Sequence, residues 1–488
     1  MSDAKQSTDR IEPYVWKIAG VVILGMMMSI LDTTIVNVAL DTLSEDLHST
    51  IAQIQWVATG YLLALAAVIP LTGWSARRFG AKRVYLASIV LFTVGSALCG
   101  LAESSTSLIL FRVLQGVGGG MIMPISQMIM AEVAGPKRMG KVMSIVVMPA
   151  MLAPILGPVV GGLILENLHW SWIFFVNVPI GIVAAILGAR MLPESKLGEA
   201  GKLDVTGLLL LVTSMPLVVY GLSEIATKES FTAPTVLWPI VAGIALAAAF
   251  GWHALRVERP LLDVRLYANR VFAAASLTTF GLGAALFGAM ILIPLYYQQV
   301  RGESVVVTGL LLGPQGLGML MVAPFTARVT QRFGGGRVAV VGVSILCLSS
   351  LPLVFIGANT SIVLISVALL ARGIGIGLSF IPTTTVAFAS LRTDQLSDAT
   401  PQMNVLQRVG GAIGTAVLAV VLQRASVGAA TSSELAGAFA TANWWALGIA
   451  ALSLIPCVVL LRAEGPRGTH TPTPAEELAE VELEPLGV

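Results

Sequence analysis

Two ionisable side chains stand within long apolar stretches of this sequence. Asp32 lies in MMMSILDTTIVNVAL, residues 26–40, and Arg112 lies in SLILFRVLQGVGGG, residues 107–120. A charge in hydrocarbon costs on the order of several kcal/mol unless it is paired, hydrated or neutralised by a proton. A carboxylate can take up and release a proton, whereas an arginine keeps its charge. Together the two types could carry out proton exchange, with the arginine tuning the carboxylate.

The composition indicates an integral membrane protein. Of 488 residues, 56% are hydrophobic and 11% are charged, against about 25% charged in an average soluble domain. The formal net charge of +2 gives no reason to expect a nucleic-acid partner. Three cysteines, Cys99, Cys347 and Cys457, lie in apolar runs without metal-ligand spacing, so we interpret them as small buried side chains and expect no metal.

The apolar runs predict an all-α membrane protein with fourteen transmembrane helices. Each run approaches the ~20 residues that a helix needs to cross the bilayer, and helices satisfy their own backbone groups in lipid. The first run follows a polar N-terminus, and we interpret it as a retained span and not as a signal peptide. The expected spans are 15–39, 52–73, 84–103, 105–131, 142–165, 170–192, 203–222, 236–256, 271–298, 306–328, 337–357, 361–390, 404–424 and 442–462.

The basic residues predict the orientation of these spans. With the N-terminus in the cytoplasm, 23 of the 29 lysines and arginines fall in inward loops, tails and adjoining helix ends. Only Lys228, Arg301 and Arg424 fall in outward loops. This asymmetry places both termini in the cytoplasm. It also puts Asp32 and Arg112 at one depth, each ~10 Å below the outer surface at 1.5 Å per residue, so the two side chains could pair.

A repeat indicates two related halves. RFGAKRV at residues 78–84 recurs as RFGGGRV at residues 332–338, an offset of 254. Parallel six-helix repeats with a site between them are typical of transporters. We therefore expect six-helix bundles at 15–192 and 271–462, two accessory helices at 203–256, a cytoplasmic tail at 1–14 and a disordered cytoplasmic tail at 463–488.

Five motifs in order resemble the major facilitator superfamily, and within it the fourteen-span drug:proton antiporter family of EmrB/QacA type. They are LDTTIVNVAL from residue 31, WVATGYLL from 56, LFRVLQGVGGG from 110, GPVVGG from 157 and WSWIFFVNVPIG from 170. The resemblance implies that Asp32 and Arg112 couple transport to protons. It also implies gating through the loop motif GWSARRFGAKR, with Gly73, Arg77, Arg78 and Gly80.

One residue departs from that loop motif. The family usually has an acid where this chain has Arg77, and that acid is thought to latch the cytoplasmic side closed. Gating here would then rest on contacts between arginine and backbone, or on another acid such as Asp394 or Asp398.

Further candidates bend helices or line a substrate cavity. Helix breakers and small residues in 142–165 would let that helix bend or slide against a neighbour: Pro154, Gly157, Pro158, Gly161 and Gly162. The cavity candidates share a helical face with Asp32 or Arg112, or are aromatic residues near outer ends that could equally be interfacial anchors: Met28, Gln115, Gly119, Trp56, Tyr61, Tyr296 and Tyr297.

The sequence thus predicts a proton-coupled antiporter that exports amphipathic organic compounds by alternating access, as in multidrug efflux and antibiotic resistance. We expect a monomer in the inner (cytoplasmic) membrane of the cell, with lipids as neighbours, no cofactor, and a proton gradient as the energy source. The alternatives are a nutrient:proton symporter, an exporter of one endogenous lipid or metabolite, and an integral-membrane enzyme or receptor. Asp32 and Arg112 could also form a static pair that fixes helix packing.

Overall fold

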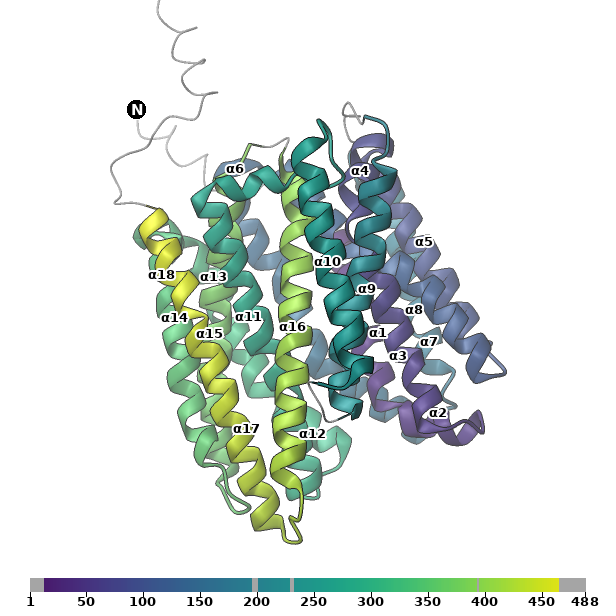
Figure 1. Ribbon diagram of the computed structural model, residues 1–488, viewed down its shortest axis with the longest axis vertical. Coiled ribbons are helices and arrows are strands. Elements are labelled where there is room, and N and C mark those ends of the chain that lie inside the picture. Colours follow the sequence, from purple (N-terminus) through teal and green to yellow (C-terminus); the bar gives the residue numbers. More distant parts are fainter. Residues whose placement is uncertain (1–12, 195–200, 229–231, 393–394, 465–488) are drawn as a thin grey trace, which may run out of the picture.

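The computed structural model describes residues 13–194, 201–228, 232–392 and 395–464, which form helices joined by short connections (Figure 1). Within these ranges, the side chains of residues 134–155 and of some other positions, among them Asn37 and Pro158, lie outside the description. The tails expected at 1–14 and 463–488 fall almost entirely outside it, as does Asp394.

The N-terminal helices carry both residues with which the sequence analysis began. They are α1 (Pro13–Val38), α2 (Leu40–Asp46), α3 (Ile51–Val68), α4 (Leu71–Phe79), α5 (Ala81–Gly100), α6 (Ser105–Asn167), α7 (Trp172–Phe175) and α8 (Asn177–Met191). Two long helices follow, α9 (Val205–Lys228) and α10 (Pro234–Arg256).

The C-terminal helices occupy the other side of the molecule in Figure 1. They are η2 (Val264–Ala268), α11 (Arg270–Leu295), the π-helix η3 (Tyr296–Val300), α12 (Val305–Leu311), α13 (Gly313–Phe333), α14 (Gly335–Ser350), η4 (Leu351–Phe355), α15 (Ile362–Ala389), α16 (Leu396–Ser426), α17 (Ser432–Leu452) and α18 (Leu454–Ala463).

Twelve helices in the described residues are long and apolar enough to cross a membrane, or thirteen if the bent pair α3–α4 is one span. The span expected at 52–73 is bent, because α3 and α4 meet at an angle of 56°. Pro70 lies at this break, and proline cannot donate the backbone hydrogen bond that a continuous helix requires.

The long element α6 contains the spans expected at 105–131 and 142–165. An unbroken helix from Arg112 to Gly157 would extend about 68 Å. Yet Arg112 bonds to Asp32 of α1, and Gly157 packs directly against Thr34 of the same helix. The two ends of α6 therefore lie side by side, and the chain must reverse its direction between them.

Two other helices begin well before the expected boundaries. Helix α16 starts at Leu396, whereas the span was expected from 404, and the last span begins at Ser432, whereas it was expected from 442. Polar residues such as Asp398 and Glu434 occupy these first turns. They lower the local hydropathy but are compatible with a helix start, where acidic side chains interact favourably with the positive end of the helix dipole.

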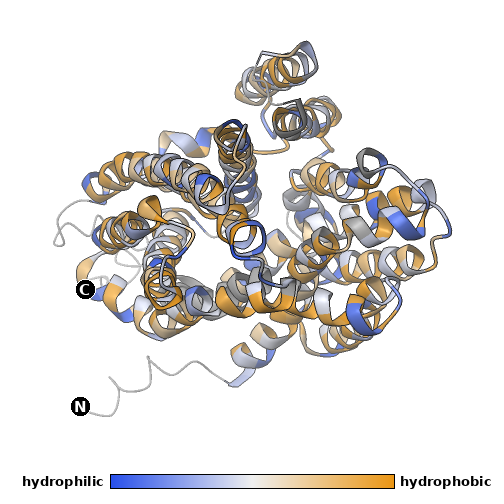
Figure 2. Cartoon of the chain, turned by 90° about the horizontal axis from the view of Figure 1, so that it is seen from below, coloured by the Kyte–Doolittle hydropathy of each residue, from blue (hydrophilic) through white to orange (hydrophobic). Residues whose placement is uncertain are grey.

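The surface is apolar where a soluble protein would be polar. Large hydrophobic side chains are widely exposed, including Phe355 at 73%, Val363 at 71% and Trp238 at 70%, and apolar residues are prominent on the outward faces of the bundle when it is viewed end-on (Figure 2). Exposure on this scale suits lipid and not water. The chain is a multi-pass integral membrane protein.

Helices α9 and α10 connect the two groups of helices. Tyr220 of α9 stacks on Trp56 of α3, with ring centroids 5.8 Å apart. Further along, Val218 and Leu222 of α9 share an apolar cluster with Ala416 and Val420 of α16. Helix α9 therefore packs against α3 on one side and α16 on the other.

The repeated loops adopt one backbone conformation. Gly80 has φ 87° and ψ 140°, and Gly334 has φ 90° and ψ 147°. Each glycine ends one helix and begins the next, at the spacing of 254 that relates the two loop sequences. Residues with a side chain rarely adopt this conformation, which explains why both loops carry glycine there.

Candidate functional site: a buried carboxylate network

Asp32 and Arg112 form a buried ion pair. Arg112 Nη1 lies 2.6 Å from Asp32 Oδ2, and the two side chains are 1% and 0% exposed. Asp32 lies on α1 and Arg112 lies one to two turns into α6. The two residues that the sequence places at one depth are thus in direct contact.

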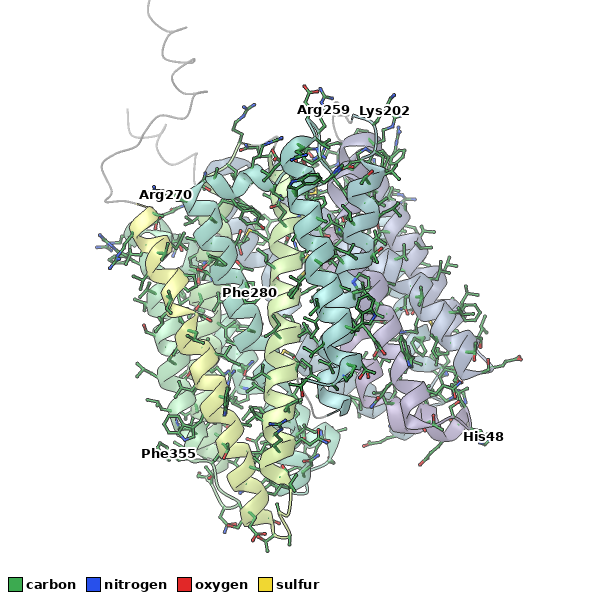
Figure 3. All side chains as sticks on the ribbon, viewed as in Figure 1. His48, Lys202, Arg259, Arg270, Phe280 and Phe355 are labelled. Atoms are coloured by element: carbon green, nitrogen blue, oxygen red, sulfur yellow. The ribbon has the colours of Figure 1, made fainter. Side chains whose placement is uncertain are left out.

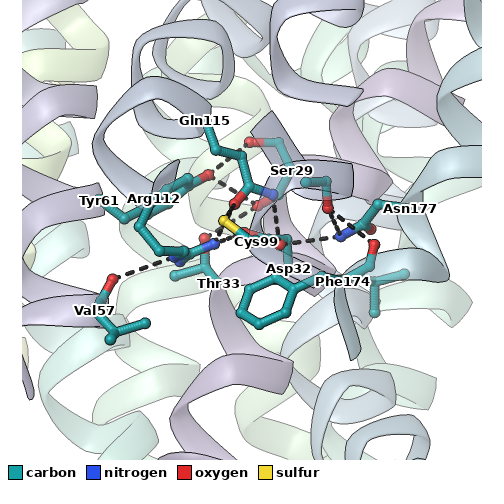
Figure 4. A network of polar contacts seen from close by, with 12 residues as sticks. Ser29, Asp32, Thr33, Val57, Tyr61, Cys99, Arg112, Gln115, Phe174 and Asn177 are labelled. Atoms are coloured by element: carbon teal, nitrogen blue, oxygen red, sulfur yellow. Dashed lines mark hydrogen bonds and ion pairs between the residues drawn. The ribbon is translucent and has the colours of Figure 1, made fainter. Parts of the chain in front are cut away.

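Two amides complete the surroundings of the carboxylate (Figure 4). Gln115 Nε2 donates to Asp32 Oδ1 at 2.8 Å, and Asn177 Nδ2 donates to the same oxygen at 3.0 Å. Gln115 is one turn beyond Arg112 on α6, whereas Asn177 is the first residue of α8. Three N–H donors from two further helices therefore converge on the carboxylate of α1.

The guanidinium of Arg112 is held on several sides. Its Nε donates to the backbone oxygen of Val57 at 3.2 Å, and Nη1 donates to Gln115 Oε1 at 2.7 Å. The guanidinium carbon lies 4.0 Å from the centre of the Tyr61 ring, a cation–π contact. Arg112 thus links α1, α3 and α6.

An outer set of polar groups orients the amides. Asn177 Nδ2 donates to Ser96 Oγ at 3.1 Å, and Ser96 Oγ donates to the backbone oxygen of Phe174 at 2.9 Å. Cys99 Sγ lies 3.6 Å from Gln115 Oε1. A network whose buried members are each paired fixes one arrangement of the helices that supply them.

This arrangement can respond to a proton in one specific way. A proton on Asp32 would remove the negative charge that faces Arg112, although the arginine would stay buried and charged. The guanidinium would then lack its counter-charge, and the contacts that join α1, α3 and α6 would weaken. Protonation of a single carboxylate could therefore bias the packing of three helices.

Four of the seven predicted cavity residues lie near this network. Gln115 and Tyr61 belong to it, and the Tyr61 hydroxyl lies 3.4 Å from the backbone oxygen of Ser29. Met28 is fully buried in the adjoining core. A Cβ on Gly119 would stand 2.7 Å from the Tyr61 hydroxyl. Glycine at that position thus lets α6 approach this phenol without displacing it.

The other three candidates lie elsewhere. Trp56 packs on α9, as described above. Tyr296 and Tyr297 are fully buried in an apolar cluster of the C-terminal helices, where Tyr296 donates a hydrogen bond to Gly357 O at 2.7 Å. They are therefore neither exposed at an interface nor close to Asp32.

The residues of the loop motif GWSARRFGAKR meet α16. Arg77 Nη1 lies 2.7 Å from Asp398 Oδ1, and Gly73 packs directly against the backbone oxygen of Ser397. Arg78 is exposed and Gly80 makes the turn described above. Of the two acids considered as partners of Arg77, Asp398 contacts it, and Asp394 lies outside the described residues.

The predicted bending residues lie partly within the description. Gly157 and Gly161 pack against Thr34 and Ile35 of α1, and Gly162 is buried. The side chains of Pro154 and Pro158 lie outside the described residues. The observed role of Gly157 and Gly161 is close packing between helices.

Sequence reasoning missed Asn177 and Ser96 as parts of the site. Asn177 stands within the motif WSWIFFVNVPIG, and a buried amide in so apolar a stretch was a signal that could have identified it. Ser96 gives no comparable signal, because serine is common in packed membrane helices.

Comparisons with known proteins agree with this fold. The sequence profile of the Major Facilitator Superfamily matches residues 22–415. The "Multidrug resistance protein B homolog" of Mycobacterium tuberculosis is 38% identical over 424 residues, covering 86% of this chain and 78% of that protein. The "Multidrug export protein EmrB" of Haemophilus influenzae is 33% identical over 399 residues, covering 81% and 78%.

Solved structures support the same fold. The human organic anion transporter MFSD10 (TETRAN) is similar with a TM-score of 0.64 at 16% identity, covering 92% of this chain and all of that chain. The proton:xylose symporter XylE gives a TM-score of 0.61 at 15% identity, covering 89% and 94%.

The chain belongs to the Major Facilitator Superfamily. Its relatives are of the EmrB/QacA type, which confirms the resemblance found in the sequence. It is accordingly a membrane transporter and not an enzyme.

Proposed function

We propose that this protein exports amphipathic organic compounds in exchange for protons, as a multidrug efflux antiporter of the inner (cytoplasmic) membrane. The supporting observation is the fully buried Asp32, the carboxylate that contacts Arg112, Gln115 and Asn177. The names of its relatives, which describe multidrug resistance and export, support the substrate class.

In the proposed mechanism, Asp32 carries the proton. When Asp32 is ionised, the network holds α1, α6 and α8 together around the carboxylate. When Asp32 is protonated, Arg112 loses its counter-charge and the helices can repack. Alternating access would expose the carboxylate first to one side of the membrane and then to the other.

The proposed architecture has fourteen spans and both termini in the cytoplasm. Residues 15–192 and 271–462 would form the two moving bundles, and 203–256 the accessory pair, in a monomer. Basic side chains support this orientation, since Lys202, Arg259 and Arg270 lie at one end of the molecule and His48 lies toward the other (Figure 3). That basic end would face the cytoplasm.

We assign the cytoplasmic gate to the contact between α4 and α16. Arg77 and Asp398 come from the N-terminal and C-terminal helices respectively, so their ion pair closes the two groups against each other. The usual acid of the loop motif is replaced by a base, and the acid is supplied by the opposite bundle. The positive charge of this latch therefore lies on α4, and its negative charge lies on α16.

Transport by inverted membrane vesicles with an imposed pH gradient tests the function. The wild type and the control Asp46→Asn, which changes an exposed acid, should couple movement of an amphipathic dye to proton flux. Asp32→Asn should fold but lose this coupling. Full coupled transport by Asp32→Asn would contradict the mechanism, and transport of the dye together with the proton would indicate a symporter.

A further inference from the structure

Two arginines within the C-terminal helices have no charged partner among the described residues. Arg372 of α15 is 4% exposed, and within the described part of the chain its side chain bonds to the backbone oxygen of Ala285, at 3.3 Å. Arg408 of α16 has no hydrogen bond or ion pair to any residue that the structure describes, and it is partly buried. Buried arginines normally have acidic or other charge-compensating partners, so this arrangement requires an explanation.

The packing of α16 shows which way Arg408 faces. One side of the helix packs against α9, and another packs against α11 through Gly410 and Gly414. Asn404, one turn before Arg408, donates to Gln127 Oε1 of α6 at 2.8 Å. Residues four apart share a helical face. Arg408 therefore faces the N-terminal helices, across the interface between the two groups.

Arg408 thus faces the same group of helices that carries the carboxylate network, since Gln127 and Arg112 both belong to α6. Arg372 adds positive charge at a similar level of the membrane, because it bonds to Ala285 of α11 while the adjacent Gly283 packs against Gln407 of α16. The described helices thus bury Arg112 and Arg372 and partly bury Arg408, whereas Asp32 is the buried carboxylate among the described residues and is already neutralised by Arg112.

We infer that Arg408 binds the negatively charged headgroup of an amphipathic substrate at the interface between the two groups of helices. This inference rests on the proposed export function and specifies its substrate class: amphiphiles that carry a carboxylate, sulfonate or phosphate. A guanidinium donates paired hydrogen bonds to such groups. A cationic substrate would meet uncompensated positive charge, and Asp32 is already occupied by Arg112 and two amides.

The negative charge of an amphiphile can be removed while its chain and fluorophore are kept the same. Purified protein in lipid nanodiscs is titrated with the fluorescent amphiphile 11-(dansylamino)undecanoate and with its neutral methyl ester. The wild type should bind the carboxylate about tenfold more tightly than the ester, as expected for a charge-assisted hydrogen bond. Arg408→Gln should bind the two probes equally, and Arg408→Lys should retain most of the preference.

Matched controls separate this site from folding and from proton coupling. Arg424→Gln removes an exposed arginine of the same helix and should keep the preference. Binding of the methyl ester by Arg408→Gln would verify that this variant is folded. An unchanged preference for the carboxylate in a folded Arg408→Gln would overturn the inference, as would equal binding of both probes by the wild type.

Failure of the proposed export function can be distinguished from failure of the anion site. Asp32→Asn should retain the preference for the carboxylate, because binding needs no proton gradient. If Asp32→Asn keeps both this preference and full proton-coupled transport, the proton mechanism is wrong and the anion site stands. If coupled transport depends on Asp32 but the preference does not depend on Arg408, the anion site is wrong and the transport mechanism stands.

Discussion

Arg77 and Asp398 are 321 residues apart in the sequence, and their side chains meet at 2.7 Å at the end of the molecule where α4 contacts α16. Arg77 Nη1 also donates to Ser397 Oγ at 2.7 Å, so the first turn of α16 receives two bonds from one guanidinium. Because α4 and α16 belong to different groups of helices, separation of these groups on this side must break both bonds.

Exchange of the two charges tests this latch. Arg77→Asp should place two acids together and favour the state that is open to the cytoplasm, which slows export. The side chains are 25% and 18% exposed, so we expect a contribution of about 1 kcal/mol, or about fivefold in the conformational equilibrium. Export assays on Arg77→Asp, Asp398→Arg and the double variant should show recovery in the double variant. No recovery would indicate that the pair is not the latch.

The buried pair of Asp32 and Arg112 should be far more sensitive to deletion of the arginine side chain than to Asp32→Asn, which keeps a side-chain oxygen that can accept from Arg112. Arg112→Ala leaves a buried carboxylate without its counter-charge, which costs about 3–5 kcal/mol. We expect little folded protein by size-exclusion chromatography. The double variant Asp32→Asn/Arg112→Gln removes both charges and should recover the folded protein without proton coupling. Proton-coupled export by this double variant would show that the pair is only structural.

The glycines of the two repeated loops should each resist substitution. Gly80→Ala and Gly334→Ala force a side chain into a conformation that costs about 1–3 kcal/mol, with φ 87° and 90°. Both variants should unfold at lower temperatures, and the double variant should show the sum of the two effects. Gly448→Ala is the control, since a Cβ there meets nothing within 4 Å. A neutral result at Gly80 or Gly334 would contradict the backbone argument.

Much of this arrangement could be predicted from the sequence. Hydropathy located most spans, and the depth of Asp32 and Arg112 anticipated that they could meet. The position of Asn177 could not be derived in this way, because its contact with Asp32 depends on the packing of α8 against α1. The partner of Arg77 was left open between two acids and a backbone contact for the same reason. Contacts between distant helices follow from packing, which periodicity does not encode.

The early start of α16 was also beyond a reading of hydropathy, whereas the reversal within α6 follows from the two spans expected at 105–131 and 142–165. Polar residues such as Asp398 were assigned to a loop because a hydropathy window excludes them, yet they form the first helical turn that Arg77 contacts. Tyr296 and Tyr297 show that a position near a helix end does not predict exposure. Their position near a helix end suggested an interface, whereas tertiary packing buries both of them.

A second exposed ion pair, between Lys82 at the start of α5 and Glu194 after α8, makes stability depend on pH. The two atoms Lys82 Nζ and Glu194 Oε1 are 2.9 Å apart, and the hydrogen bond from Lys82 holds the pKa of Glu194 below its ordinary value of 4.5. A lowered folded-state pKa means that the stabilisation is present above pH 4.5 and is lost as the pH falls through the folded-state value.

The expected effect of this pair is small, because Glu194 is largely exposed. Unfolding temperatures of the wild type and Glu194→Gln should differ slightly at pH 7 and converge in acid. Lys82→Met should give the same pattern, since it removes the other partner. A difference between wild type and Glu194→Gln that grows as the pH falls would have the wrong sign, and would mean that Glu194 stabilises the fold in its protonated form.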